Sequence, residues 1–237
     1  MKRPDLTLSV DIEEDIRNVL VFFEYEKNQD VLNNFLPTEA KFLLNENIEK
    51  DNRKIKATEF VRKFYEENAE DINIGLHGVK ESWNKYSENY YKYIEELFDG
   101  REWLSDKYRG VLSIFKMYSR EIDRKLFFFP YKHDVERFSN RVIGHEMLHF
   151  MFFDFLFDRY QLRENSKLEG RPENYIWQLS EAFNSLVENN PLYMESIGIG
   201  YSGKPYIGQE GMVTLMGEQF GKEKNIGKLL DKWIIGV

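Results

Sequence analysis

One short run in the sequence has residue types and spacing suited to metal chemistry. His145, Glu146 and His149 form an H-E-x-x-H pattern. If this stretch is helical, the two histidines lie one turn apart on the same face, where both imidazoles can reach one metal ion. The glutamate projects beside them, where it can act as a base on a water molecule held by that ion. The pattern therefore predicts a metal site held by His145 and His149, with Glu146 as general base.

The residues around this pattern predict a helix that is buried on all sides. Apolar side chains occupy nearly every face of the stretch 138–153, which is typical of a helix inside a core. Buried polar groups must be paired, because stranding one costs on the order of 1–3 kcal/mol. A zinc ion with its water would pair with all three polar side chains. The alternative is two core histidines satisfied by backbone or carboxylate hydrogen bonds, with Glu146 in an ion pair.

The composition limits the available ligands and function classes. The 237 residues include no cysteine, which excludes disulfide scaffolds, cysteine zinc sites and thiol nucleophiles. The net charge of −8 argues against general nucleic acid binding, because phosphate recognition depends on clustered Lys and Arg. Apolar runs are too short to cross a bilayer, and no apolar signal segment follows the first residues. We expect a cytoplasmic protein with no nucleic acid partner and no membrane partner.

The sequence pattern also predicts the elements that must position the site. In the first part of the chain we expect a strand over 6–12 and a helix over 13–23. Further helices are expected after Thr38 and after Thr58, each threonine acting as an N-cap. A polar loop is expected between them at 45–56.

In the middle of the chain, apolar and aromatic residues at helical spacing predict a helix over 79–97 that ends before Gly100. Its aromatic stripe is expected to pack on a core rather than bind a cofactor. Two neighbouring antiparallel strands are expected over 108–118 and 125–131, with Pro130 at the end of an edge strand.

The last part of the chain is expected to be helical. Asp134 is expected to cap a long helix that runs to about 160, and Pro172 opens another helix that stops at 189–191. A Gly-rich stretch at 198–208 is expected to be a surface loop or a mobile flap. Two more helices follow, the last ending near Trp233.

These elements predict a single α+β domain spanning 1–237, mainly helical with a small antiparallel sheet and a buried active-site helix. Within it we expect a possible N-terminal helical subdomain over 1–105 and a catalytic core over 106–237.

The motif and its surroundings resemble the zincin metallopeptidases. The segment from His145 to His149 follows an edge-strand-like stretch at 126–130 and precedes a second helix, so the resemblance spans about 108 to 190. It implies a zincin-like core and a zinc-dependent peptidase that hydrolyses a peptide or protein substrate. It also implies that the stretch 126–130 pairs with an extended peptide. The resemblance does not cover the residues before this region.

The third zinc ligand separates the branches of the zincins. A metzincin requires a histidine at the position of Phe155, and the SprT-like proteases use a histidine further along, whereas no histidine follows His149. Upstream, His133 would lie roughly 18 Å away along a helix axis, and His77 is remote in sequence. The remaining ligand is therefore a carboxylate, which resembles the gluzincin arrangement, in which a Glu on a following helix completes the site.

Glu181, in the middle of the following helix, is the preferred third ligand. Asp154 and Asp158 share a helix with the histidines, but at about 100° per residue they point away from His149 and are expected to pair with Arg or Lys. The side of the helix that carries Glu181 is also polar enough to be a solvated face. The alternative carboxylate ligands are Glu173, Glu188 and Glu195.

Two other parts of a gluzincin site have no assigned residue. Many gluzincins carry an Asp four residues after the ligand Glu, which orients a zinc-bound His, whereas this chain has Ser185 there with Asn184 beside it. Either can accept a hydrogen bond from an imidazole, more weakly than a carboxylate. The donor that would stabilise an oxyanion is not assigned. The tyrosines available after the motif are Tyr175, Tyr193, Tyr201 and Tyr206.

Three functions are therefore weighed. The zinc peptidase is favoured because Glu146 is retained, and a structural metal site has no use for that residue. The first alternative is a catalytically silent zincin-like module that binds a peptide or protein partner. The second is a metal-free helical interaction domain.

Overall fold

The structure, a computed structural model, divides the chain into two compact units assembled from separate segments. The sheet unit comprises Asp5–Ser82 and Lys107–Ile143, and the helical unit comprises Met1–Pro4, Trp83–Asp106 and Gly144–Val237. The described residues are 3–25, 29–45, 48–104, 107–131, 138–200, 209–223 and 225–236. The single domain and its division after residue 105 remain predictions.

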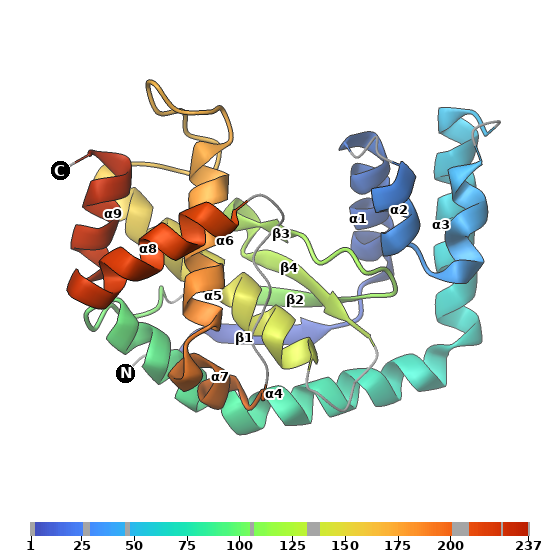
Figure 1. The fold of residues 1–237 in the computed structure, drawn as a ribbon. Coiled ribbons are helices and arrows are strands. Elements are labelled where there is room, and N and C mark those ends of the chain that lie inside the picture. Colours follow the sequence, from blue (N-terminus) through green and yellow to red (C-terminus); the bar gives the residue numbers. More distant parts are fainter. Residues whose placement is uncertain are drawn as a thin grey trace. The chain divides into compact units, whose positions relative to one another are not determined.

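A four-stranded mixed sheet in the order β1-β2-β4-β3 forms the centre of the sheet unit (Figure 1). The strands are β1 (Asp5–Ser9), β2 (Lys107–Ser113), β3 (Arg120–Glu121) and β4 (Leu126–Pro130). The first, second and fourth strands are parallel, and only β3 runs antiparallel to its neighbour. The α+β class is thus confirmed, whereas the prediction of an antiparallel sheet is wrong.

The direction of β4 explains the error. The charged stretch between the two predicted strands contains β3. The 3-10 turn η2 (Ile122–Arg124) joins β3 to β4 as a hairpin. Lys125 closes the turn with a φ of 49°. Because β3 makes the hairpin, β4 leaves it in the same direction as β2. The strand β4 therefore lies between β2 and β3, which contradicts its prediction as an edge strand.

Along the chain, helices of the sheet unit lie between β1 and β2. They are α1 (Ile12–Tyr25), α2 (Gln29–Phe35), the 3-10 helix η1 (Thr38–Leu44) and α3 (Lys50–Glu67). The predicted first helix is confirmed. The strand before it ends earlier than predicted because the Asp11 carboxylate accepts a hydrogen bond of 3.2 Å from the Glu14 amide at the start of α1.

The predicted N-caps at Thr38 and Thr58 are wrong. Pro37 precedes η1, so Thr38 is its first residue, and Thr58 lies inside α3. The predicted loop over 45–56 is wrong from residue 50 onward, where α3 begins. This helix is polar in composition and buries a narrow stripe at four-residue spacing. The buried residues of that stripe are Ala57, Val61 and Tyr65.

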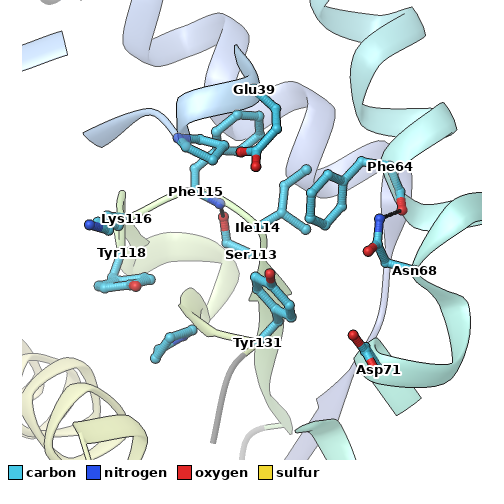
Figure 2. A pocket seen from close by; sticks show the side chains of 12 residues that line it. Glu39, Phe64, Asn68, Asp71, Ser113, Ile114, Phe115, Lys116, Tyr118 and Tyr131 are labelled. Carbon is cyan, nitrogen blue, oxygen red and sulfur yellow. Dashed lines mark hydrogen bonds between the residues drawn. The ribbon is translucent and has the colours of Figure 1, made fainter. Parts of the chain in front are cut away.

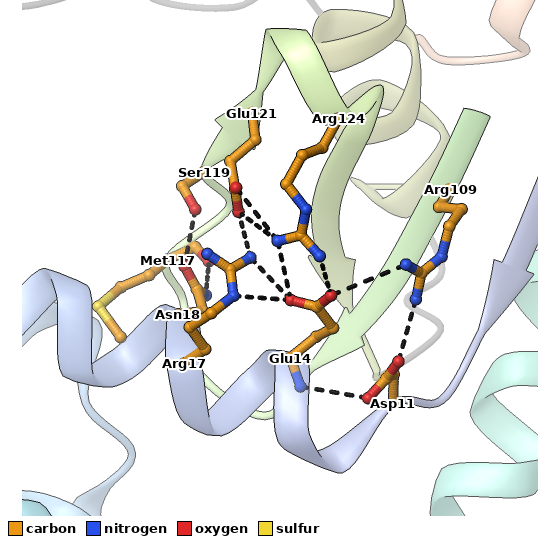
Figure 3. Close-up of polar contacts among 9 residues, drawn as sticks. All are labelled: Asp11, Glu14, Arg17, Asn18, Arg109, Met117, Ser119, Glu121 and Arg124. Atoms are coloured by element: carbon orange, nitrogen blue, oxygen red, sulfur yellow. Dashed lines mark hydrogen bonds and ion pairs between the residues drawn. The ribbon is translucent and has the colours of Figure 1, made fainter. Parts of the chain in front are cut away.

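Two polar clusters hold α1 to the sheet. Asp15 is fully buried and accepts hydrogen bonds from Ser113 Oγ at 2.6 Å and Tyr65 Oη at 2.9 Å. Burial raises the pKa of its carboxyl to about 6, although these hydrogen bonds oppose the shift. The second cluster surrounds Glu14, whose carboxylate contacts arginines of α1, of β2 and of the turn before β4 (Figure 3).

The helical unit contains four helices besides the parts of α4 (Ala69–Leu97) and α5 (Phe138–Tyr160) that belong to it. They are α6 (Tyr175–Glu188), α7 (Pro191–Ile197), α8 (Glu210–Glu223) and α9 (Ile226–Ile234). The tail helices α8 and α9 are confirmed. The short α7 was not predicted, although Pro191 follows an Asn190 cap whose side chain accepts from the Leu192 amide at 2.9 Å.

Several other boundaries follow from local hydrogen bonds. The helix α6 begins at Tyr175 rather than at Pro172, whose carbonyl accepts from the Tyr175 amide at 3.0 Å. The helix α4 ends as predicted, with Gly100 at a φ of 81° and its amide bonded to the Glu95 carbonyl at 2.8 Å. The predicted cap at Asp134 and residues 201–208 of the Gly-rich stretch lie outside the described residues.

Aromatic side chains fill the core of the helical unit. Phe152 of α5 packs on Phe183 of α6 with ring centroids 5.0 Å apart. The stripe on α4 packs in the core as predicted, with Tyr90 fully buried against Trp83 and Trp103. Among the described residues, no helix combines the length and apolar character that crossing a membrane requires.

Candidate metal centre

The predicted ligands converge in the helical unit. The helix α5 presents His145 and His149 one turn apart, with their Nε2 atoms separated by 3.1 Å. The helix α6 brings Glu181 to both: its Oε2 lies 3.4 Å from His145 Nε2, and its Oε1 lies 3.4 Å from His149 Nε2. One ligand atom from each of the three residues lies within 4.8 Å of the others. The three could therefore hold one metal ion.

The site is buried, as the sequence around the motif predicted. His149 has no exposed side-chain surface, and Glu181 is 2% exposed, so the polar side of α6 is not a solvated face. Met147, Leu148 and Phe150 of α5 are fully buried around the histidines. The apolar surroundings lower the local dielectric, which strengthens every charge interaction in the site.

Glu146 lies beside the group formed by His145, His149 and Glu181 without belonging to it. Its side chain is 5% exposed, and its Oε1 is 3.9 Å from His145 Nε2. This is the position expected for a base that acts on a molecule held by the histidines rather than for a further ligand.

Glu188 contacts the opposite side of the first histidine. Its Oε1 lies 2.5 Å from His145 Nδ1, and its side chain is 3% exposed. Nε2 of the same ring lies 3.1 Å from His149 Nε2 and 3.4 Å from Glu181 Oε2, so these two residues and Glu188 occupy opposite sides of the imidazole. Glu188 thus lies where a carboxylate can orient His145, outside the group formed by His145, His149 and Glu181.

The two residues considered for that role act differently. The Asn184 side chain donates through Nδ2 to the backbone carbonyl of His145 at 2.9 Å, and so holds the main chain of α5 rather than an imidazole. Ser185 is 8% exposed and no contact of its side chain with either histidine is found in the part of the chain that the structure describes.

Three carboxylates surround one imidazole. Burial alone would lower the pKa of His145, but Glu188, Glu181 and Glu146 outweigh it and hold that pKa well above its usual range. Burial would likewise raise the pKa of Glu181, yet His149 and His145 lower it well below its usual value. Such a concentration of buried negative charge requires positive charge beside it, either a proton on the imidazole or a metal cation.

Gly144 permits a close approach immediately before the first histidine. A Cβ at this position would lie 2.7 Å from the Tyr193 hydroxyl and 3.4 Å from Tyr90 Cε2. Tyr90 also donates to the Gly144 carbonyl at 2.8 Å. The absence of a side chain at Gly144 thus allows α5 to pack closely against α7 and α4 immediately before His145.

The remaining candidates lie elsewhere. Asp158 forms an ion pair with Arg101, whose guanidinium also donates to the Asp154 carbonyl at 3.2 Å, so the predicted pairing of Asp158 with a basic residue is confirmed. Glu173 is exposed and pairs with Lys167 at 2.5 Å. Glu195 is exposed on α7. These positions do not support Glu173 or Glu195 as ligand.

The contacts found for the remaining described histidine and tyrosines are with residues other than the three proposed ligands. His77 is exposed and lies 3.3 Å from Glu81, while His133, Tyr201 and Tyr206 lie outside the described residues. Tyr175 donates its hydroxyl to the Trp233 carbonyl at 2.8 Å. Tyr193 is fully buried between the rings of Tyr90 and Tyr93.

Comparison of the chain with known protein families, with curated proteins and with solved structures found no match. The functional argument therefore depends on the site itself.

Proposed function

We propose that the protein is a zinc-dependent peptidase of gluzincin type. The Glu181 carboxylate lies within 3.4 Å of both motif histidines, and this observation carries the proposal. The sequence pattern predicts the helix of Glu181 but does not determine how that helix packs against the helix of the histidines. His145, His149 and Glu181 are the proposed metal ligands, and Glu146 is the proposed general base.

The separations of the ligand atoms support this assignment. Zinc ligands lie about 2.0–2.1 Å from the ion, so neighbouring corners of a tetrahedral site are about 3.3 Å apart. The two imidazole nitrogens are 3.1 Å apart, and the Glu181 carboxylate spans them, with Oε2 3.4 Å from His145 Nε2 and Oε1 3.4 Å from His149 Nε2. The donor set of two imidazoles and one carboxylate also matches catalytic zinc sites, which keep a position open for water or substrate.

The chemistry divides between the ion and the chain. A bound zinc ion supplies a Lewis acid that makes a water molecule nucleophilic near neutral pH and polarises the scissile carbonyl. Glu146 takes the proton from the attacking water onto its carboxylate and delivers it to the leaving amine. Glu188 keeps the His145 ring in the tautomer and orientation that turn Nε2 inward. Asn184 fixes the main chain at the same residue.

Hydrolysis of a general protein substrate tests the proposal. We expect the zinc-loaded wild type to cleave fluorescently labelled casein, and Glu146→Gln to lose at least about 100-fold in rate because general base catalysis contributes that much or more. Glu169→Gln, at an exposed glutamate, is the matched control and should retain full activity. A chelator should abolish activity, and zinc should restore it.

Two results would contradict the proposal. Undiminished hydrolysis by Glu146→Gln would remove the base from the mechanism. Zinc-loaded wild type that cleaves neither casein nor a mixed peptide library would favour the silent, partner-binding module.

A further inference from the structure

A pocket in the sheet unit has no lining residue in common with the candidate metal centre. Its volume is about 330 Å³, and it is lined by residues of α3, of the start of α4 and of the ends of two strands (Figure 2). Ser113 ends β2 and Pro130 ends β4, and the two are register partners in this parallel pair. Ligands of open parallel sheets commonly bind outside the carboxyl ends of the strands.

The pocket continues into a wider groove with an aromatic floor. The groove, of about 650 Å³, shares Glu39, Phe64 and Asn68 with the pocket. Three rings of the groove and one ring of the pocket form a continuous series of edge-on or tilted contacts, with centroids 5.9 to 6.0 Å apart. In order, they are Phe42, Phe60, Phe64 and Tyr131. Phe42 is 46% exposed, so part of this apolar floor is open to solvent.

Two carboxylates give the pocket its charge. Glu39 and Asp71 both line it, and within the described part of the chain neither forms an ion pair or a side-chain hydrogen bond. Lys116 is the only described cation in the lining, and Figure 2 shows it beside Tyr118, away from Asp71. Carboxylates beside aromatic faces suit an organic cation, because the rings attract positive charge through their faces.

We propose that this groove binds an extended peptide and that the pocket takes a cationic side chain of that peptide. A guanidinium or ammonium group lies against Phe64 and Tyr131, where it is attracted by the carboxylates of Glu39 and Asp71 at opposite ends of the pocket (Figure 2). Neighbouring apolar side chains cover Phe60 and Phe42. The proposal does not rest on the peptidase function.

Titration calorimetry with a defined probe tests it. The probe is a capped hexapeptide with one arginine followed by two phenylalanines, and the protein carries Glu146→Gln so that hydrolysis cannot consume the probe. We expect saturable binding that is at least about tenfold weaker when citrulline, the neutral isostere, replaces arginine. The double variant Glu39→Gln with Asp71→Asn should weaken binding by a similar factor, and added salt should weaken it further.

Glu66→Gln is the matched control, because Glu66 is an exposed glutamate of α3 outside the groove lining, and it should bind the probe unchanged. Equal affinity for the arginine and citrulline peptides would overturn the proposal, as would unchanged binding by the double variant or no binding at all. A concentration-dependent dimer in sedimentation that Phe42→Asp abolishes would assign the groove to a second copy of the chain and would also overturn it.

Discussion

At the scale of single residues, Glu188 is the proposed orienting partner of His145. Its carboxylate lies 2.5 Å from Nδ1, on the side of the ring opposite the ligand nitrogen. Removal of such an orienting carboxylate typically weakens metal binding 10- to 100-fold. We expect Glu188→Ala to show this loss in a competition titration for zinc, and Glu188→Gln to show a smaller one because an amide oxygen can still accept from Nδ1.

The control for this prediction is Glu195→Gln, at an exposed glutamate of α7, which should bind zinc like the wild type. Wild-type affinity in Glu188→Ala would show that the imidazole is oriented by other contacts.

The two histidines are predictable as a pair because helical spacing places them on one face, whereas Glu181 as third ligand follows from the resemblance to the gluzincins. That resemblance places the orienting residue four positions after Glu181, where this chain has Ser185. The carboxylate that contacts the His145 ring from α6 is Glu188, seven residues after Glu181 and two helical turns along the same face. That spacing places Glu188 and Glu181 on the same face of α6. Which imidazole nitrogen Glu188 reaches depends on how α5 and α6 pack, and the periodicity of the sequence does not determine this packing.

Asp15 is a second buried residue with a measurable consequence. Its folded-state pKa of about 6 lies above the ordinary value of 3.8, so the folded protein retains a proton that the unfolded chain has released between these pH values. The contribution of Asp15 to stability therefore falls as the pH rises through this window, by about 3 kcal/mol in total.

Asp15→Asn does not titrate and isolates this effect. We expect the free energy of unfolding of the variant, relative to the wild type, to rise by about that amount between pH 4 and pH 7 in urea denaturation. The absolute difference also includes altered hydrogen bonds to Ser113 and Tyr65, so the slope is the diagnostic quantity. A difference that stays constant with pH would contradict the prediction.

At the scale of elements, Glu14 holds α1 to two parts of the sheet region. Its carboxylate lies 2.7 Å from Arg17, 3.7 Å from Arg109 and also contacts Arg124 (Figure 3). Burial alone would raise the pKa of Glu14, but Arg124 and Arg17 lower it below its usual value of 4.5. The stabilisation is therefore present above that value and is lost as the pH falls through the folded-state pKa.

We expect Glu14→Gln to reduce the free energy of unfolding by about 1–3 kcal/mol at pH 7, because it leaves three neighbouring cations without their shared carboxylate. The difference from the wild type should shrink as the medium is acidified. Glu13→Gln is the control: Glu13 is 71% exposed and contacts Arg62 alone at 2.9 Å, so its loss should cost under about 1 kcal/mol. Equal effects of the two substitutions would contradict the role of the cluster.

Most helices were predictable because their apolar stripes repeat at helical spacing. The sheet was less predictable, since β3 has only two residues and consists of charged side chains, Arg120 and Glu121. The pairing of β3 with β4 depends on tertiary contacts rather than on a local sequence pattern. With β3 in the hairpin, β2 and β4 run parallel instead of antiparallel. The start of α3 was missed for a similar reason, because its narrow stripe gains its stability from packing rather than from local propensity.

At the scale of the whole molecule, the candidate metal centre belongs entirely to one unit. All three proposed ligands, the base and the orienting Glu188 lie within Gly144–Val237, on α5 and α6. The H-E-x-x-H pattern lies on α5, and its proposed third ligand, Glu181, lies on α6, the next helix of the same segment. A metal that binds only the folded chain should also stabilise this unit against unfolding.

The zinc content of the purified protein tests the central proposal most directly. Elemental analysis of wild type prepared without chelator should find about one zinc ion per chain, as a site with three protein ligands and one open position predicts. Glu181→Ala, which removes the carboxylate that joins the two histidines, should contain substantially less. A wild type free of zinc would instead indicate a metal-free core in which a protonated His145 pairs with Glu181 and Glu188, and full occupancy in Glu181→Ala would contradict the assigned third ligand.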